Sequence, residues 1–557
     1  MVGKMKIFSL CKKYLLSHKI LLLLYIFLCL VSSLLSIMLP YLSGNFIDIL
    51  ISQRRKYFIY NFCILYGCIG TLKIILGYFC PLLYVKMQVE MGYELNKDIV
   101  FHVQNLSLTY IQRQDSVFLS QNINTDSNNL IIFCLTIIQN FLTNALMISI
   151  PFFIVLFISP RICIVNIVFL TIYIILYIIF RKPLYKHAFM FKESQSKFFT
   201  SLHQQLKKMK FTKLHSAEQV LHDKLKSDFC SLRLGVIEFQ KINCLFNSLD
   251  NIVLTLSQIS FYLLGGLQIL AGELTIGMYT IFTTYFSMMI NSIRYFFNIG
   301  KSYQEALVSY DRIINILNQK TETNGSVQID KIDKIDIQNL SFSYGEKEII
   351  KNLNMTFTKG KIYGIKGGNG TGKTTLINLL LGLYIDEKKG VVLYNGIDIS
   401  KLDMKKIRRN LIGVSEQEPV MLNSTIDQNL TLSREPLNNY KLEKYIKLLH
   451  LEQCINKNGL DFVINDNSNI SGGEKQKLSI IRVLLKEPDI MVFDEPTSAL
   501  DMKSAKCFSD YLLKVRDNRI IIIITHESQL MEICDVIYNL DDNSKNEVSE
   551  DNSAINL

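Results

Sequence analysis

Residues 367–374 read GGNGTGKT, and this stretch indicates what kind of domain the C-terminal half of the chain forms. An apolar run, Lys361 to Ile365, precedes it, and a helix-like stretch, Thr375 to Leu383, follows. A strand, a glycine loop and a helix in this order are typical of a phosphate-binding loop, in which backbone amides surround phosphate oxygens at a helix N-terminus. The alternative is an incidental glycine turn, and the flanking pattern argues against it.

In such a loop each residue type has a distinct task. The ammonium of Lys373 neutralises the β and γ phosphates, which makes it catalytic as well as binding, and the Thr374 hydroxyl can ligate Mg²⁺. The predicted cofactors are therefore ATP and Mg²⁺. We expect the nucleotide to contact Gly367, Gly368, Asn369, Gly370, Thr371, Gly372, Lys373, Thr374 and Thr375.

A second candidate catalytic element is the apolar run Ile490 to Phe493, which is followed by Asp494 and Glu495. The first carboxylate can hold the Mg²⁺ shell and the second can polarise the attacking water. An apolar strand that ends in two acids is common, so alone this pattern leaves the catalytic and structural interpretations open. The phosphate-binding loop upstream favours the catalytic one.

The N-terminal half has a different composition. The chain has 557 residues and a formal net charge of +11. Because 49% of its residues are hydrophobic, it is too apolar to be an intrinsically disordered protein. Six apolar stretches are long enough to cross ~30 Å of hydrocarbon. They are Ile20–Leu42, Phe58–Val85, Leu130–Ser159, Ile162–Phe180, Ile242–Leu270 and Thr275–Phe297.

Charge predicts the orientation of these spans. Lys and Arg concentrate in the N-terminal stretch and between Arg181 and Lys241, and neither residue type occurs between Ala271 and Gly277. The basic segments should face the cytoplasm, and an even number of spans places both termini there. We therefore expect a multi-pass protein of the cytoplasmic membrane, with its soluble domain inside the cell.

These patterns divide the chain into four parts. Residues 1–317 should form an all-α transmembrane domain, residues 318–334 a linker, residues 335–541 an α/β P-loop NTPase domain, and residues 542–557 a polar tail. About 19 residues precede the first span, so no N-terminal peptidase domain is expected.

Between the two catalytic elements lies ISGGEKQKLSIIRVLLKEP, Ile470 to Pro488, in which Ser471, Gly472 and Gly473 begin a predicted helix. With this motif the soluble half resembles the ATP-binding cassette. The whole chain, with six spans ahead of the cassette, resembles a half-size ATP-binding cassette exporter from about Lys4 to Leu540.

The resemblance implies roles for further residues. Tyr344 resembles the aromatic that stacks on adenine, and His526, after the strand Ile520 to Ile524, resembles the switch histidine near the γ-phosphate. It also implies Gln417 as a Q-loop residue that contacts nucleotide and Mg²⁺, and Glu495 and His526 as catalytic groups. The implied signature residues are Ser471, Gly472, Gly473 and Glu474, and Ser498 to Asp501 are the implied D-loop.

The chain departs from the common family pattern at Ile470, Glu474 and Ile481, and none of these changes removes a catalytic group. The segment after Leu540 also lacks the glycine-containing strands that usually close the domain. The family further implies a dimer, because the signature of one subunit covers the nucleotide of another. A homodimer would have two competent sites, and a heterodimer is the alternative.

The two long inner connections between spans, about Lys86 to Asn129 and Arg181 to Lys241, should be helices that extend beyond the bilayer. The segments predicted at their turns, Phe118 to Asn128 and Leu206 to His215, should couple the halves, with a solvated charged face as the alternative. The sixth span carries a polar stripe, which should either line a substrate cavity or form interhelical hydrogen bonds. The stripe comprises Thr280, Thr284, Ser287, Asn291, Arg294 and Asn298. We hypothesise that Asp250 and Arg294 form an ion pair, because an unpaired charge is costly in a membrane.

The predicted function is ATP-driven export of a hydrophobic or amphipathic compound, such as a peptide, a drug-like molecule or a lipid. A lipid flippase with the same ATPase is the first alternative, and the sequence has no motif that separates the two. An ATP-gated channel or regulatory protein is less favoured, because it would tolerate loss of Glu495. A nucleic-acid ATPase is disfavoured by the six spans.

Overall fold

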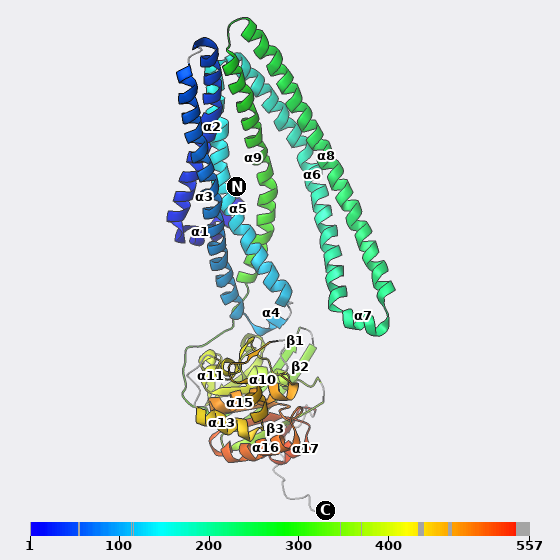
Figure 1. Cartoon of the computed structure of the whole chain (residues 1–557). Coiled ribbons are helices and arrows are strands. Elements are labelled where there is room, and N and C mark those ends of the chain that lie inside the picture. Colours follow the sequence, from blue (N-terminus) through cyan, green and yellow to red (C-terminus); the bar gives the residue numbers. More distant parts are fainter. Residues whose placement is uncertain are drawn as a thin grey trace, which may run out of the picture. The chain divides into compact units, whose positions relative to one another are not determined.

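The computed structural model describes residues 2–53, 56–112, 114, 116–345, 347–368, 370–432, 439–465 and 470–541. Their contacts form two compact units, shown in Figure 1. Unit 1 contains Met1–Val103 and Ser116–Asn318, and unit 2 contains Gln104–Asp115 and Gln319–Leu557. The predicted polar tail, residues 542–557, lies outside the described residues.

Unit 1 is built from long helices. They are α1 (Val2–Ser17), α2 (Lys19–Gln53), α3 (Lys56–Gln104), α5 (Ser116–Ile158), α6 (Pro160–Lys207), α7 (Met209–His215), α8 (Glu218–Leu270) and α9 (Ile276–Leu317). Within the unit, α6 and α8 run side by side and α7 joins their ends (Figure 1). Helix α9 packs against α2 and α5.

Five helical segments in the described part of the chain are long and apolar enough to span a membrane. They are Lys19–Ser52, Lys56–Gln104, Ile123–Ile158, Cys163–Lys207 and Glu218–Leu270. The predicted sixth span falls within α9, which begins after Thr275, whose hydroxyl accepts a hydrogen bond from the Met278 amide at 3.1 Å. The helical order of unit 1 therefore matches the six predicted spans.

The inner connections are helices that extend beyond the apolar stretches, as the sequence predicts. The second connection turns at α7, which confirms the position of the predicted turn at Leu206 to His215, while its coupling role stays a prediction. The predicted position of the first turn is wrong. Phe118 to Asn128 lies within α5, and the chain turns earlier, at the short helix α4 (Leu108–Gln112). The segment before α5 lacks Gly and Pro, so nothing in the sequence marked this turn.

Unit 2 has two main sheets. A mostly antiparallel sheet has the strand order β2-β1-β4-β5, and a parallel sheet has the order β11-β3-β10-β9-β6. The strands are β1 (Lys334–Tyr344), β2 (Lys347–Thr358), β3 (Lys361–Lys366), β4 (Lys389–Tyr394), β5 (Ile397–Asp398), β6 (Ile412–Ser415), β7 (Ser424–Thr425), β8 (Val463–Ile464), β9 (Ile490–Asp494), β10 (Ile520–Ile524) and β11 (Val536–Asn539).

Helices surround these sheets. The described helices of unit 2 are α4, α10 (Lys373–Leu380), α11 (Met404–Asn410), α12 (Ile426–Thr431), α13 (Asn439–Leu448), α14 (Glu452–Asn458), α15 (Gly472–Lys486), α16 (Met502–Val515) and α17 (Ser528–Glu532), with short 3₁₀ turns at Ile385–Glu387 and Arg516–Asn518.

The parallel sheet sets the position of the predicted site. Strands β9 and β10 are buried along their whole length, which explains their continuous apolar sequences. In register, Ile524 pairs with Ile365 on one side and with Asp494 on the other. The carboxyl ends of β3, β10 and β9 therefore lie next to each other, where ligands bind in open α/β sheets.

Candidate functional site

The loop between β3 and α10 has the backbone conformation that its glycines allow. Gly370 and Gly372 have φ values of +83° and +95°, which other residues adopt only with strain. Gly372 directly precedes α10, so the helix begins at Lys373, two residues before the predicted Thr375, and it ends at Leu380, three residues before the predicted Leu383. Asn369 lies outside the described residues.

The Lys373 ammonium points back into this loop. Its Nζ donates to the Gly367 carbonyl oxygen at 2.5 Å and the Gly368 carbonyl oxygen at 3.1 Å, and it lies 3.1 Å from His526 Nε2. Two predicted site residues, Lys373 and His526, therefore lie in contact although they are 153 residues apart in sequence. The Gly368 amide donates to Asp541 Oδ1 at 2.9 Å, a contact that the sequence did not indicate.

The two predicted carboxylates follow β9. Asp494 Oδ2 lies 3.5 Å from the Thr374 hydroxyl, and Glu495 Oε2 accepts a hydrogen bond from Gln417 Nε2 at 2.8 Å. Glu495 has φ +45°, and its amide donates to the Ile524 carbonyl oxygen at 2.8 Å. Burial raises the pKa of Asp494 above its usual value, and the adjacent charge of Glu495 adds to this shift.

Oxygen donors at this edge of the sheet suit a hard cation. Thr374, Asp494 and Gln417 supply a hydroxyl, a carboxylate and an amide oxygen, which are the donors that Mg²⁺ prefers. A nearby positive charge would also stabilise the charged form of Asp494, whose pKa is raised by burial. The residues present therefore fit the predicted Mg²⁺ position.

Tyr344, the predicted adenine-stacking residue, lies at the end of β1. Its ring packs edge-on against Phe342, and its hydroxyl lies 2.9 Å from that of the buried Tyr384. The Tyr384 hydroxyl in turn donates to Gln112 Oε1 of α4 at 3.1 Å. A hydrogen-bonded chain therefore connects the predicted adenine site to α4 within unit 2.

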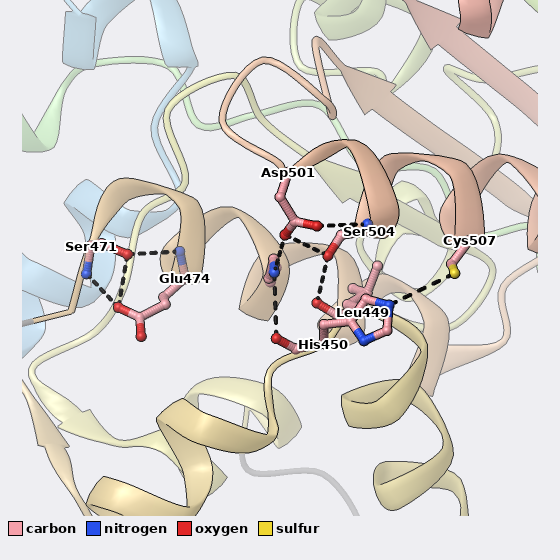
Figure 2. Close-up of polar contacts among 8 residues, drawn as sticks. Leu449, His450, Ser471, Glu474, Asp501, Ser504 and Cys507 are labelled. Carbon is pink, nitrogen blue, oxygen red and sulfur yellow. Dashed lines mark hydrogen bonds and ion pairs between the residues drawn. The ribbon is translucent and has the colours of Figure 1, made fainter.

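The signature segment begins α15 with a capping box (Figure 2). The Ser471 hydroxyl accepts from the Glu474 amide at 3.3 Å, and Glu474 Oε2 accepts from the Ser471 amide at 2.7 Å. Burial opposes ionisation of Glu474, but the Ser471 hydrogen bonds outweigh it and the pKa of Glu474 is lowered. A glutamate at this position is therefore compatible with the fold, because it caps its own helix.

Asp501 is bound to the signature helix through Lys477, which sequence reasoning missed. Lys477 Nζ donates to Asp501 Oδ2 at 2.8 Å and lies 3.4 Å from the His450 carbonyl oxygen. Asp501 also caps α16 by accepting from the Ser504 amide at 2.9 Å. Lys477 and Ser504 hold the pKa of Asp501 well below its usual range. Nothing in the Lys-Gln-Lys run at 475–477 distinguished the buried lysine from an exposed one.

The predicted site residues thus form two groups. Lys373, Thr374, Gln417, Asp494, Glu495 and His526 meet at the ends of the parallel strands, whereas Ser471, Gly472, Gly473, Glu474 and Asp501 meet at the start of α15. Within the described residues, no hydrogen bond joins the second group to residues 367–374.

Residues 104–115 also belong to unit 2, which the sequence did not predict. The Glu322 amide donates to the Asn105 carbonyl oxygen at 2.7 Å, Leu106 forms a β-bridge with Thr321, and Leu108 packs against a hydrophobic core that contains residues of both main sheets. Thr109 hydrogen-bonds Glu387. We call residues 104–115 the docking segment.

Two predictions about unit 1 can also be compared with the structure. Arg294 Nη2 contacts Asp250 Oδ2, which confirms the hypothesised ion pair between α9 and α8. Arg294 of the polar stripe forms an interhelical contact, as one interpretation of the stripe predicts. Thr280 and Thr284 line a cavity, and its use by a substrate stays a prediction. The Asn298 side chain lies outside the described residues.

Comparison with known proteins matches both units. The family described as ABC transporter transmembrane region matches residues 22–293, and the family described as ABC transporter matches residues 350–498. This chain belongs to the ATP-binding cassette (ABC) transporters. Its architecture is that of a half-transporter, with a multi-pass transmembrane region followed by the ATP-binding domain of this family.

Individual relatives cover part of the chain. The leukotoxin export ATP-binding protein LtxB of Aggregatibacter actinomycetemcomitans is 32% identical over 285 residues, which is 50% of this chain and 40% of the relative. The ATP-dependent lipid A-core flippase of Syntrophus aciditrophicus is 28% identical over 289 residues, 51% of this chain and 47% of the relative. The chain therefore matches less than half the length of these relatives.

A solved structure shares the fold over nearly the whole chain. It is described as a bacterial Atm1-family ABC exporter with ATP bound, and it superimposes with a TM-score of 0.80. The alignment covers 95% of this chain and 94% of that one, at 18% sequence identity. The predicted fold class, a helical transmembrane domain followed by an α/β P-loop ATPase domain, is confirmed.

Proposed function

We propose that this chain hydrolyses ATP to export a hydrophobic or amphipathic compound across the cytoplasmic membrane by alternating access. The observation that carries the proposal is the meeting of Lys373, Asp494, Glu495 and His526 at the ends of β3, β9 and β10. Membership of the ABC transporters and the apolar helices of unit 1 support it.

In this proposal each side chain has one task. Lys373 leaves the loop carbonyls and binds the β and γ phosphates, Glu495 polarises the attacking water, and His526 contacts the γ-phosphate. Thr374, Asp494 and Gln417 would hold Mg²⁺, which supplies charge neutralisation on the phosphates when it is bound. The contact between Gln417 and Glu495 orients the carboxylate before nucleotide arrives.

The working unit is a dimer in the membrane, with both termini and the cassette in the cytoplasm. The separation of the two groups of site residues supports this, because a second subunit would bring Ser471 and its neighbours to the nucleotide of the first. A homodimer would have two equivalent sites, since Glu495 and His526 are both present. Nucleic acid is not a partner in this proposal.

The test is ATP turnover by the full chain in lipid nanodiscs, alone and with candidate peptides, drug-like compounds and lipids. Glu495→Gln should abolish turnover, and Glu532→Gln, an exposed glutamate on α17, should leave it unchanged. Stimulation by one compound class, lost in Glu495→Gln, would support export of that class. Absence of turnover in the parent chain would refute an autonomous ATPase.

A lipid flippase is the second candidate, favoured by the similarity to the lipid A-core flippase. It predicts ATP-dependent movement of a labelled lipid between leaflets of a proteoliposome. Transport of a water-soluble peptide without lipid movement would exclude it.

A further inference from the structure

A cavity of about 440 Å³ lies among α2, α3 and α9 in unit 1, a size in the range of ligand-binding pockets. Its described lining residues include one cation, Lys73, and no carboxylate. They are Ser36, Leu39, Pro40, Ser43, Ile47, Tyr66, Lys73, Thr280, Thr284 and Met288. The cavity therefore combines apolar side chains, hydroxyl groups and a single positive charge.

Contacts on either side of the cavity keep α2 and α3 in place. The rings of Phe46 and Phe62 stack with centroids 4.0 Å apart, and those of Tyr25 and Tyr84 lie 6.1 Å apart. On α2 these contacts are separated by about 30 Å, at ~1.5 Å per residue. Four of the five cavity residues of α2 fall between them and the fifth, Ile47, directly follows Phe46, so aromatic contacts lie near both ends of the cavity.

The wall formed by α2 and α9 is tightly packed. A Cβ added at Gly44 would lie 2.4 Å from Ile281 Cγ1, and the Tyr285 hydroxyl donates to the Ile37 carbonyl oxygen at 2.8 Å. Asp48 Oδ1 accepts from the Gly277 amide at 2.8 Å. These contacts make the hollow a feature of the packing between fixed helices.

The serine and threonine hydroxyl groups of the cavity already donate hydrogen bonds within the protein. Each of these hydroxyls donates to a carbonyl oxygen of its own helix at 2.7 to 2.9 Å. The residues are Ser36, Ser43, Thr280 and Thr284. They can therefore only accept hydrogen bonds from a ligand. The remaining side-chain donors are the Lys73 ammonium and the Tyr66 hydroxyl, which lie seven residues apart on one face of α3.

Lys73 has no acidic neighbour among the described residues that line the cavity. It lies in the middle of an apolar span, 17 residues from the start of α3 at Lys56. An ionisable group at such a position is costly and usually has a functional partner. Since none of the described lining residues carries a negative charge, an anion from outside the chain would supply this partner.

We infer that this cavity binds an amphipathic compound with an anionic group, which contacts Lys73 and Tyr66 while its apolar part packs on Leu39, Ile47 and Met288. This inference rests on the proposed function, because it assigns a chemical class to the exported compound. The anion is a carboxylate or a phosphate ester.

The test compares a fluorescent fatty acid, 11-(dansylamino)undecanoic acid, with its uncharged methyl ester. Binding of each is measured by fluorescence on the full chain in phosphatidylcholine nanodiscs without ATP. The parent should bind the acid at least about tenfold more tightly than the ester, the usual effect of a hydrogen bond to a charged group. Lys73→Gln should remove this preference and Lys73→Arg should keep it.

Lys97→Gln is the matched control, since Lys97 is a lysine of the same helix outside the cavity. Stronger displacement by lysophosphatidic acid than by lauric acid would identify a phosphate group, and the reverse a carboxylate. An equal acid preference in Lys73→Gln and the parent would overturn the inference. So would equal loss of acid and ester binding with a lowered unfolding temperature, because Lys73 would then be structural.

This test is separate from that of the proposed function, since it needs no hydrolysis. Normal ATP turnover without acid preference would refute the anionic class alone. Acid preference without turnover in the parent chain would refute the proposed ATP-driven export and leave the binding site in place.

Discussion

The contact between Lys477 and Asp501 makes a quantitative prediction. The Lys477 side chain is 11% exposed and that of Asp501 is 53% exposed, so water can replace the lysine at the carboxylate. A hydrogen bond to a charged group contributes about 1.5–3 kcal/mol, and half-exposure of the acid reduces this to roughly 1–1.5 kcal/mol. Lys477→Met should therefore lower the unfolding temperature of the ATP-binding domain, of about 200 residues, by about 3 °C.

The assay is thermal unfolding of the full chain in nanodiscs for Lys477→Met, Asp501→Asn and the double variant. Because the two residues share one contact, the double variant should lose less than the sum of the single losses, by about 1 kcal/mol. Lys475→Met on the same helix controls for the change of side chain. Additive losses within ~0.3 kcal/mol would refute the reasoning, because the residues would then contribute independently.

Two further predictions concern the ATP-binding domain. Tyr384→Phe should destabilise it by about 1–2 kcal/mol, because two hydrogen bonds are lost. In thermal unfolding, Gln112→Ala should then lower the stability of this variant less than that of the parent. An equal loss of stability in both would count against the hydrogen-bonded chain from Tyr344 to α4. Asp494→Asn should raise the unfolding temperature of the nucleotide-free protein at pH 7.5, because the raised pKa of Asp494 means that the fold disfavours the charged carboxylate. This gain in unfolding temperature should shrink as the pH falls through the raised folded-state pKa. A gain that grows at pH 5 would contradict the assignment.

Much of the fold follows from local sequence patterns. The strands at Ile490 and Ile520, the loop at Gly367 and the helix at Lys373 combine periodicity with glycine spacing, and the structure has all four. The ion pair between Asp250 and Arg294 could be predicted because an unpaired charge in an apolar span has few other solutions.

Other features depend on tertiary packing and had no local signal. The turn at α4 contains neither Gly nor Pro, so the chain read as a continuous helix there. The contact of Lys477 with Asp501 joins α15 to the residue that caps α16, and the contact of Asp541 with Gly368 joins the last described residue to the loop. Charged residues in a helix are usually solvated, so a buried lysine is not distinguishable by composition.

The docking segment has a mechanical consequence. Because residues 104–115 belong to unit 2, the backbone passes between the units three times, near residues 103, 115 and 318. A domain attached at one point can swivel about its tether, whereas three attachments restrict rotation as well as translation. Cutting the chain between residues 319 and 326 would leave the cassette held to the backbone of α3 and α5 only by the noncovalent contacts of the docking segment, such as that of Thr109 with Glu387.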